Sequence, residues 1–150
     1  MAERTAMTAR LIMSVGDLSL PRRLRLRGTV VAGSGEGAKF VGLPWVKKQI
    51  AEKLGFNPYL GTLNIKLSEE SVKIKKLLEK TKSIEISSIE NFCRGKCYRA
   101  SLKRHVKCAI VIPDVPNYPE DVLEIVAPVN LREKLQLKDG DHVKIEVEPP

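Results

Sequence analysis

Aromatic residues and cysteines are scarce in this 150-residue chain, which has one Trp, three Tyr, three Phe and three Cys. So few aromatic side chains do not provide a platform on which the bases of a single-stranded nucleic acid could stack. An odd number of cysteines does not predict a disulfide framework and favours a reducing compartment, so we expect a cytoplasmic protein. The apolar stretch at residues 11–15 is too short to span a membrane, and no membrane partner is expected.

The sequence does contain enough apolar residues for a core, and its charge is unevenly distributed. Hydrophobic residues make up 43% of the chain, which is typical of one globular domain. The formal net charge is +8, but residues 66–107 contain 12 Lys or Arg against 5 Asp or Glu, whereas residues 108–150 contain 4 against 9. This distribution indicates either an anionic partner or an ordinary lysine-rich surface. We interpret residues 1–23 as a poorly ordered extension and residues 24–150 as a single domain.

A glycine-rich segment follows the first predicted strand, residues 24–31. Three glycines alternate with other residues in GSGEGAKF, residues 33–40, so backbone N–H groups could line a concavity for an anion. The segment nearly matches the P-loop pattern, but Ala38 replaces the second glycine and Phe40 replaces the hydroxyl residue that would hold Mg2+. We expect no helix directly after this segment. A tight turn without any ligand explains the same residues equally well.

The segment LGFNPYLGTLNIKL, residues 54–67, joins a predicted helix at residues 44–54 to a strand that begins at Leu63. Thr62 and Asn64 are two residues apart, so in an extended chain their side chains leave on the same side. Their neutral oxygens suit a hard cation such as Mg2+, whose charge a nucleotide would also offset. Alternatively, both side chains satisfy backbone groups of the turn.

Two features of the C-terminal third indicate ligand contacts. Glu124 interrupts the apolar run VLEIV, where a carboxylate is either paired with a cation or in contact with a ligand. Asn130 is placed to cap a short helix, and Glu133 is placed to complete a capping box. The N-terminus of that helix could bind phosphate through its free N–H groups, with the charge of Arg132 added.

The remaining pattern predicts short strands with helices in the connections. We expect a helix at residues 68–80, a hairpin turn at residues 94–96, and strands at residues 83–89, 97–102, 106–112 and 143–147. Strands and helices do not alternate regularly as they do in a doubly wound sheet. The sequence therefore predicts a mainly β fold with short helices, built around a small closed barrel.

Three segments resemble the archaeal CTP-dependent riboflavin kinases in order and spacing: GSGEGAKF at residues 33–40, LGFNPYLGTLNIKL at residues 54–67 and VLEIVAPVNLREKLQLKDGD at residues 122–141. The resemblance covers residues 25–147. It implies a six-stranded cradle-loop (riboflavin-kinase-like) β-barrel that transfers the terminal phosphoryl group of CTP to the 5'-hydroxyl of riboflavin, giving FMN and CDP. Transfer of this kind depends on positioning and on charge neutralisation.

The resemblance also implies roles for individual residues. Thr62 and Asn64 would coordinate Mg2+, and Glu124 would contact the flavin. No residue stands out as a general base, and Glu124 is a candidate only if the ribityl hydroxyl lies within hydrogen-bond reach of it. Two segments would hold the nucleotide, the first made of Ser34, Gly35, Glu36, Gly37, Ala38 and Lys39, and the second of Val129, Asn130, Leu131 and Arg132. We expect the protein to be a monomer.

Some positions depart from the family's pattern. Pro116 and Tyr118 stand where the family usually has Thr and His, so the hydroxyl contact to the flavin is lost or is taken over by Asn117 or the backbone. Ala38 stands where the family usually has Arg or a bulky residue. The alternative from another class is a basic barrel that binds nucleic acid and has no kinase activity. Because aromatics are few, nucleic acid is not the partner we expect.

Overall fold

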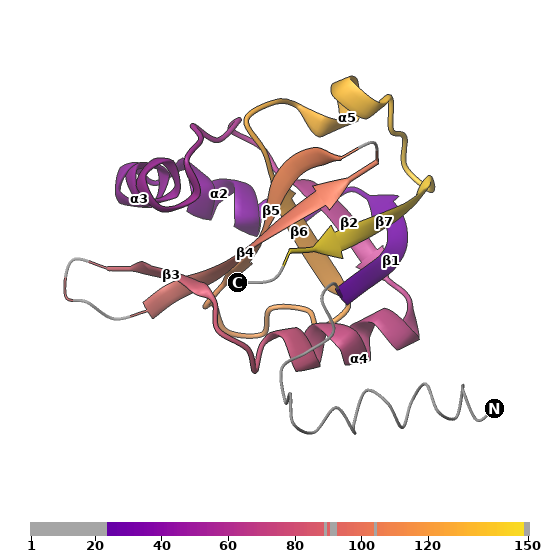
Figure 1. Ribbon diagram of the computed structural model, residues 1–150, viewed down its shortest axis with the longest axis horizontal. Helices are drawn as coiled ribbons and strands as arrows, with labels where there is room; N and C mark the ends of the chain where they lie inside the picture. Colours follow the sequence, from indigo (N-terminus) through magenta and orange to yellow (C-terminus); the bar gives the residue numbers. More distant parts are fainter. Residues whose placement is uncertain (1–23, 89, 91–92, 104, 149–150) are drawn as a thin grey trace.

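The computed structural model describes residues 24–88, 90, 93–103 and 105–148 (Figure 1). The strands are β1 (Leu24–Val31), β2 (Leu63–Leu67), β3 (Ile84–Ser87), β4 (Cys93–Leu102), β5 (Val106–Pro113), β6 (Val122–Val126) and β7 (His142–Val147). The helices are α2 (Glu36–Gly42), α3 (Pro44–Leu54), α4 (Glu69–Leu78) and α5 (Leu131–Leu135). The extension predicted at residues 1–23 lies outside the described residues. Among the described helices, none is long and apolar enough to cross a membrane.

Six of the strands form a closed antiparallel barrel, which confirms the predicted fold class. Neighbouring strands follow the order β4–β5–β6–β2–β1–β7, and β7 pairs with β4 to close the barrel. β3 pairs with the first part of β4 and lies outside the barrel. In Figure 1 this two-stranded ribbon extends to the left of the barrel, on the same side as α2 and α3.

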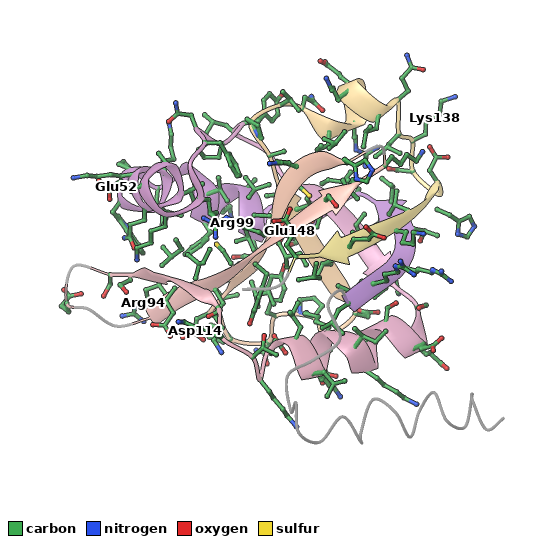
Figure 2. All side chains as sticks on the ribbon, viewed as in Figure 1. Glu52, Arg94, Arg99, Asp114, Lys138 and Glu148 are labelled. Atoms are coloured by element: carbon green, nitrogen blue, oxygen red, sulfur yellow. The ribbon has the colours of Figure 1, made fainter. Side chains whose placement is uncertain are left out.

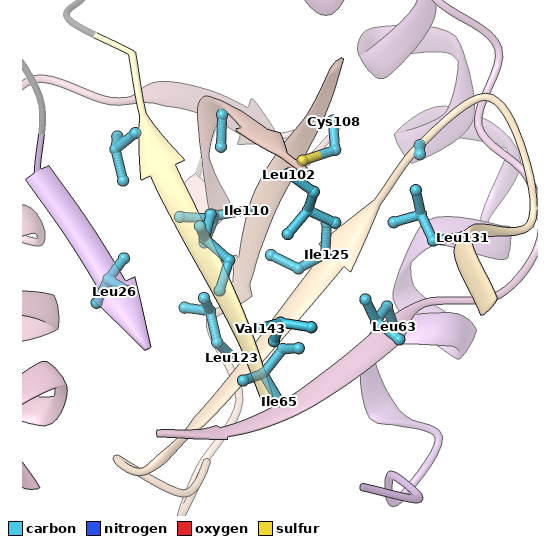
Figure 3. Close-up of a cluster of buried hydrophobic side chains, with 14 of the residues drawn as sticks. Leu26, Leu63, Ile65, Leu102, Cys108, Ile110, Leu123, Ile125, Leu131 and Val143 are labelled. Atoms are coloured by element: carbon cyan, nitrogen blue, oxygen red, sulfur yellow. The ribbon is translucent and has the colours of Figure 1, made fainter. Parts of the chain in front are cut away.

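The barrel interior is filled by alternate residues of its strands, because successive side chains in a strand point to opposite faces. Figure 3 shows side chains from several strands converging there, among them Leu26, Ile65, Ile110, Leu123, Ile125 and Val143. A second apolar cluster lies outside the barrel wall. It joins Phe40, Val41, Val46, Ile50 and Leu54 of the two helices to Ile86, Cys97, Ala109, Val111 and Val126 of the strands. β5 and β6 are therefore buried on both faces, whereas β1 and β7 alternate between buried and partly or fully exposed residues.

The prediction that no helix follows the glycine-rich segment is wrong, because α2 begins at Glu36 inside it. Gly35 precedes the helix in the left-handed conformation, with φ of 89°, which glycine adopts without strain. Two glycines within α2 weaken its intrinsic helix propensity. Burial of Phe40 and Val41 against the barrel wall compensates, and this tertiary contact is not visible in the local sequence.

The hairpin turn predicted at residues 94–96 is also wrong, because these residues lie within β4. Gly95 is directly beside the ring of Phe40: a Cβ added to it would lie 2.6 Å from that ring. The glycine therefore allows α2 to pack closely on β4 and does not form a turn. β4 pairs with β5 up to Gly95 and Pro113. Just beyond this pair, Asp114 donates its backbone N–H to the carbonyl of Arg94, and both residues are labelled in Figure 2.

The predicted helix at residues 68–80 is present as α4, with Ser68 accepting a hydrogen bond from the N–H of Ser71 at its start. The apolar Leu77 is 48% exposed and does not face the core. The buried positions are Ser71, Lys75 and Leu78, which are spaced by four and three residues on one face of the helix. A lysine thus occupies a core-facing position of α4.

Candidate functional site

The candidate site is centred on Glu124, a carboxylate that is 1% exposed on the outer side of β6. Its neighbours across the ladders are Asn64 on β2 and Val111 on β5. Thr62 donates its hydroxyl to one carboxylate oxygen, Oε1, at 2.7 Å, and Tyr118 donates its phenol to the other, Oε2, at 2.6 Å. Among the described residues Glu124 forms no ion pair, so two neutral hydroxyls hold this buried carboxylate.

The glycine-rich segment covers the polar cluster formed by Glu124, Thr62, Asn64 and Tyr118. A Cβ added to Gly37 would overlap with Oε1 of Glu124, and one added to Gly33 would overlap with the side-chain amide of Asn64. The backbone therefore passes directly over both side chains at positions where only glycine fits. In this way α2 and the turn before it exclude water from the carboxylate.

Replacing Gly37 with alanine is expected to lower the free energy of unfolding by about 1–3 kcal/mol, because the new methyl group must displace either the carboxylate of Glu124 or the helix. Gly42 provides the matched control within α2, because a Cβ added there meets no atom within 4 Å. Gly42→Ala is therefore expected to be neutral or slightly stabilising. Chemical denaturation of both variants measures the difference, and equal stability would contradict the close contact between Gly37 and Glu124.

Lys75 supports the cluster from the side of α4. Its ammonium donates to the carbonyl oxygens of Glu120 at 3.3 Å and Val122 at 3.0 Å, and it lies 5.4 Å from the centroid of the Tyr118 ring. These contacts fix the segment that leads into β6, and a cation beside an aromatic ring is attracted to it. Lys75 thereby helps to position Tyr118, which donates a hydrogen bond to Glu124.

Burial also changes the acid–base properties of these two residues. Desolvation lowers the pKa of Lys75, although nearby carboxylates, of which Glu79 has the largest effect, oppose the shift. Desolvation, followed by the hydrogen bond to Glu124, raises the pKa of Tyr118. Tyr118 therefore keeps its proton at any working pH and acts only as a donor toward the carboxylate.

Thr62 and Asn64 present oxygen atoms that fit a hard cation. Because a hydroxyl has one proton and two lone pairs, the hydrogen bond from Thr62 to Glu124 leaves its lone pairs available. Asn64 donates its Nδ2 to the carbonyl of Thr62 at 3.3 Å, and within the described residues its Oδ1 accepts no hydrogen bond. Two neutral oxygens beside a carboxylate are the ligand types that Mg2+ prefers.

The second predicted nucleotide segment lies next to the glycine-rich one. Asn130 caps α5 by accepting a hydrogen bond from the N–H of Glu133, and its own amide donates to the hydroxyl of Tyr59 at 3.1 Å. Arg132 donates to the carbonyl of Val31, the last residue of β1, and pairs with Asp139 at 2.7 Å. The two segments therefore meet at the end of β1.

A cavity of about 560 Å3 adjoins the cluster on the side of Tyr118. Its lining comes from α4, β4, the end of β5 and the loop before β6, and includes Lys75, Gly95, Ile112, Pro113 and Tyr118. Its size is typical of small-molecule sites. Tyr118 is shared by the cavity wall and by the hydrogen bonds of Glu124.

The structure brings the predicted site residues into two adjoining groups, one at Thr62, Asn64 and Glu124 and one at the end of β1. Sequence reasoning missed the supporting roles of Tyr118 and Lys75. The helical spacing from Ser71 through Lys75 to Leu78 could have placed the lysine on the buried face. The hydrogen bond of Tyr118 joins a loop to a strand and has no comparable local signal.

The closed barrel and the polar cluster beneath its glycine-rich segment define a riboflavin-kinase-like β-barrel protein. The sequence model of the CTP-dependent riboflavin kinases, described as domain of unknown function DUF120, matches residues 30–147. The chain belongs to this family.

Curated relatives agree with this assignment. The chain is 46% identical over 128 residues to a riboflavin kinase of Pyrobaculum islandicum, 41% over 128 residues to one of Methanosarcina barkeri, and 39% over 128 residues to one of Archaeoglobus fulgidus. Each match covers 83% of this chain and, in the same order, 60%, 56% and 54% of the relative. The chain thus spans a little over half the length of these relatives.

Proposed function

We propose that the protein is a CTP-dependent riboflavin kinase, which transfers the terminal phosphoryl group of CTP to the 5'-hydroxyl of riboflavin and yields FMN and CDP. The observation that carries the proposal is the buried carboxylate of Glu124, placed where the glycine-rich segment, the oxygens of Thr62 and Asn64, and the cavity beside Tyr118 meet. Membership of the family and the names of the relatives support it.

The donor nucleotide is proposed to lie against the two segments that meet at the end of β1. Backbone N–H groups of residues 34–38 and of the start of α5 would face its phosphates, where they offset negative charge without any reorganisation. The N–H of Lys39 donates to the carbonyl of Gly35, so Lys39 would contribute its side chain. Arg132 already pairs with the exposed Asp139, so its main role in this proposal is to hold α5 against β1. Nucleotide specificity for CTP is part of the proposal and rests on the family.

The acceptor is proposed to occupy the cavity beside Tyr118, with its 5'-hydroxyl directed at Glu124. In the transfer, the hydroxyl oxygen forms a bond to the terminal phosphorus while the bond from that phosphorus to the bridging oxygen breaks and CDP leaves. The hydroxyl proton passes to Glu124, because its carboxylate is a far stronger base than the neutral hydroxyls of Thr62 and Tyr118 that donate to it. Burial beneath α2 keeps water from competing as the acceptor.

Thr62 and Asn64 are proposed to hold Mg2+. The ion would supply positive charge to the phosphates of the nucleotide during transfer. The hydrogen bond between Thr62 and Glu124 would keep the metal-binding oxygen and the acceptor-binding carboxylate in a fixed relation.

Formation of FMN from riboflavin tests the function directly. The full chain is incubated with riboflavin, Mg2+ and either CTP, ATP, GTP or UTP, and the products are separated by chromatography with fluorescence detection. We expect FMN and CDP with CTP and far less FMN with the other donors. If no donor gives FMN while the protein is folded, the proposed function is wrong, and the alternative of a barrel without kinase activity gains support.

We further propose that the catalytic unit is the domain at residues 24–150, that it acts as a monomer and that it resides in the cytoplasm. The barrel closes on itself, so the fold requires no second chain to pair its strands. Light scattering at the concentration used for the kinase assay gives the mass, and activity confined to a dimer fraction would contradict the monomer.

A further inference from the structure

Basic side chains gather on the outer face of the barrel along β2, β1 and β7, which are neighbouring strands in Figure 1. Lys66 on β2, Arg27 on β1, and His142 and Lys144 on β7 point outward, because the residues on either side of each are buried or lie in the loop. Lys103, in the turn after β4, lines the same hollow of about 650 Å3. These five residues are called the basic face below.

The strand register places like charges opposite each other in the basic face. Arg27 is the direct cross-strand partner of Lys144, whereas two residues earlier on β1, Arg25 is the partner of Glu146 and forms an ion pair of 3.1 Å with it. Opposite charges across an antiparallel pair stabilise a sheet, and like charges destabilise it. The same two strands therefore carry a favourable pair in one row and a repulsive pair in the next.

Little of this charge is neutralised by the protein itself. In the part of the chain that the structure describes, Arg27, Lys103 and Lys144 form no ion pair, and no Asp or Glu lines the hollow. Lys66 contacts Asp121 at 3.3 Å, but both side chains are exposed to solvent, where such pairs contribute little. The basic face thus has an unbalanced charge that a bound anion would offset.

The chemistry of the lining identifies the kind of anion. The charges come from three strands and a turn, so a ligand that neutralises them must carry several negative charges over an extended surface. Among the described residues the hollow has no Phe, Tyr or Trp, so it offers no large aromatic platform for bases and contacts would be mainly to phosphates. The exposed large apolar residues of the described chain, Leu43, Tyr59, Leu60, Leu77 and Val129, all lie outside the hollow. A membrane surface would therefore gain no apolar anchor there.

We propose that the basic face binds the phosphodiester backbone of a nucleic acid, without reading its sequence, at a site separate from that of phosphoryl transfer. Lys66 is two residues from Asn64 on the same side of β2, so the two sites are neighbours but share no residue. The basic face does not depend on the proposed kinase activity, since none of its residues contacts the Glu124 cluster.

Fluorescence anisotropy with a labelled duplex of mixed sequence, in DNA and RNA versions, tests the proposal on the full chain. We expect binding at low salt that weakens as salt rises, with a slope of log K against log salt of roughly −3 to −4 for four cationic contacts. Vesicles containing acidic phospholipids serve as a second polyanionic surface. Binding to the vesicles but to neither duplex would overturn the proposal.

A pair of double variants separates the basic face from net charge. Lys103→Glu with Lys144→Glu alters the basic face, while Lys47→Glu with Lys48→Glu alters exposed lysines of α3, and both lower the net charge by the same four units. We expect the first double variant to lose at least about tenfold in duplex affinity at low salt and the second to lose much less. Equal losses of duplex affinity in the two double variants would mean that binding depends on net charge and not on the basic face, and would overturn the proposal.

The single variant Lys144→Glu adds a second readout, because it places a carboxylate opposite Arg27. We expect its Tm to rise while its duplex affinity falls, since the repulsive pair becomes a favourable one. FMN formation should be unchanged in all these variants, which separates a failure of nucleic-acid binding from a failure of the kinase. Unchanged duplex affinity in Lys144→Glu would contradict the proposal.

Discussion

Asn64→Ala is expected to lower kcat for FMN formation on the order of 100-fold, because it removes one of two protein oxygens proposed to hold the metal. Thr62→Ala should have a comparable effect, since it removes the other oxygen together with a hydrogen bond to Glu124. Neither residue belongs to the apolar clusters, so the fold should persist in both variants. Steady-state kinetics over a range of Mg2+ concentrations, together with thermal melts, measure these effects.

The conservative variant Asn64→Asp distinguishes a metal ligand from a packing residue. It keeps a side-chain oxygen at the same position, so it should retain much more activity than Asn64→Ala and require less Mg2+. If Asn64 only fills the space beside Gly33, neither Asn64→Asp nor Asn64→Ala should change the dependence of activity on Mg2+. Full turnover in both alanine variants would contradict the proposal that Thr62 and Asn64 bind Mg2+.

Glu124→Gln is expected to lower kcat/KM for riboflavin on the order of 100-fold and to leave KM for CTP nearly unchanged. The amide has the shape of the carboxylate but cannot take a proton from the acceptor. It also has one oxygen where Thr62 and Tyr118 both donate, so one of these hydroxyls faces an NH2 group. Measuring kcat and KM with each substrate varied in turn separates the two effects.

Two further variants make this result interpretable. Tyr118→Phe leaves the carboxylate in place and removes one of its two donors, so its effect should be smaller than that of Glu124→Gln. Glu52→Gln makes the same chemical change at an exposed position of α3, labelled in Figure 2, and should leave the kinetics unchanged. Equal losses for riboflavin and CTP in Glu124→Gln would argue against a contact between Glu124 and the acceptor.

The sequence predicted those elements whose boundaries depend on their own residues. α3 has the predicted limits because Pro44 fits its first turn and Gly55 ends it in the left-handed conformation. β1 has the predicted limits as well, Asn130 caps its helix as expected, and Ser68 caps the helix that was predicted to begin at that residue. These signals are local, so they can be recognised in the sequence without knowledge of the fold.

The features that were missed depend on residues distant in sequence. The glycines of α2 and of β4 suggested a loop and a turn, but each allows one element to pack closely on another. The buried position of Lys75 is defined by carbonyl groups 45 and 47 residues away. The repulsion between Arg27 and Lys144 exists only through the register of β1 and β7, which the sequence alone does not specify.

The pairing of β1 with β7 has a consequence for how the chain folds during its synthesis. The first described strand and the last are neighbours in the barrel, and β7 also closes it by pairing with β4 at two positions. Until Val147 has emerged from the ribosome, β1 and β4 both have an unpaired edge, and such edges invite pairing with other chains. Completion of the barrel must therefore wait until β7 has emerged, and the nascent chain is most prone to aggregate before that point.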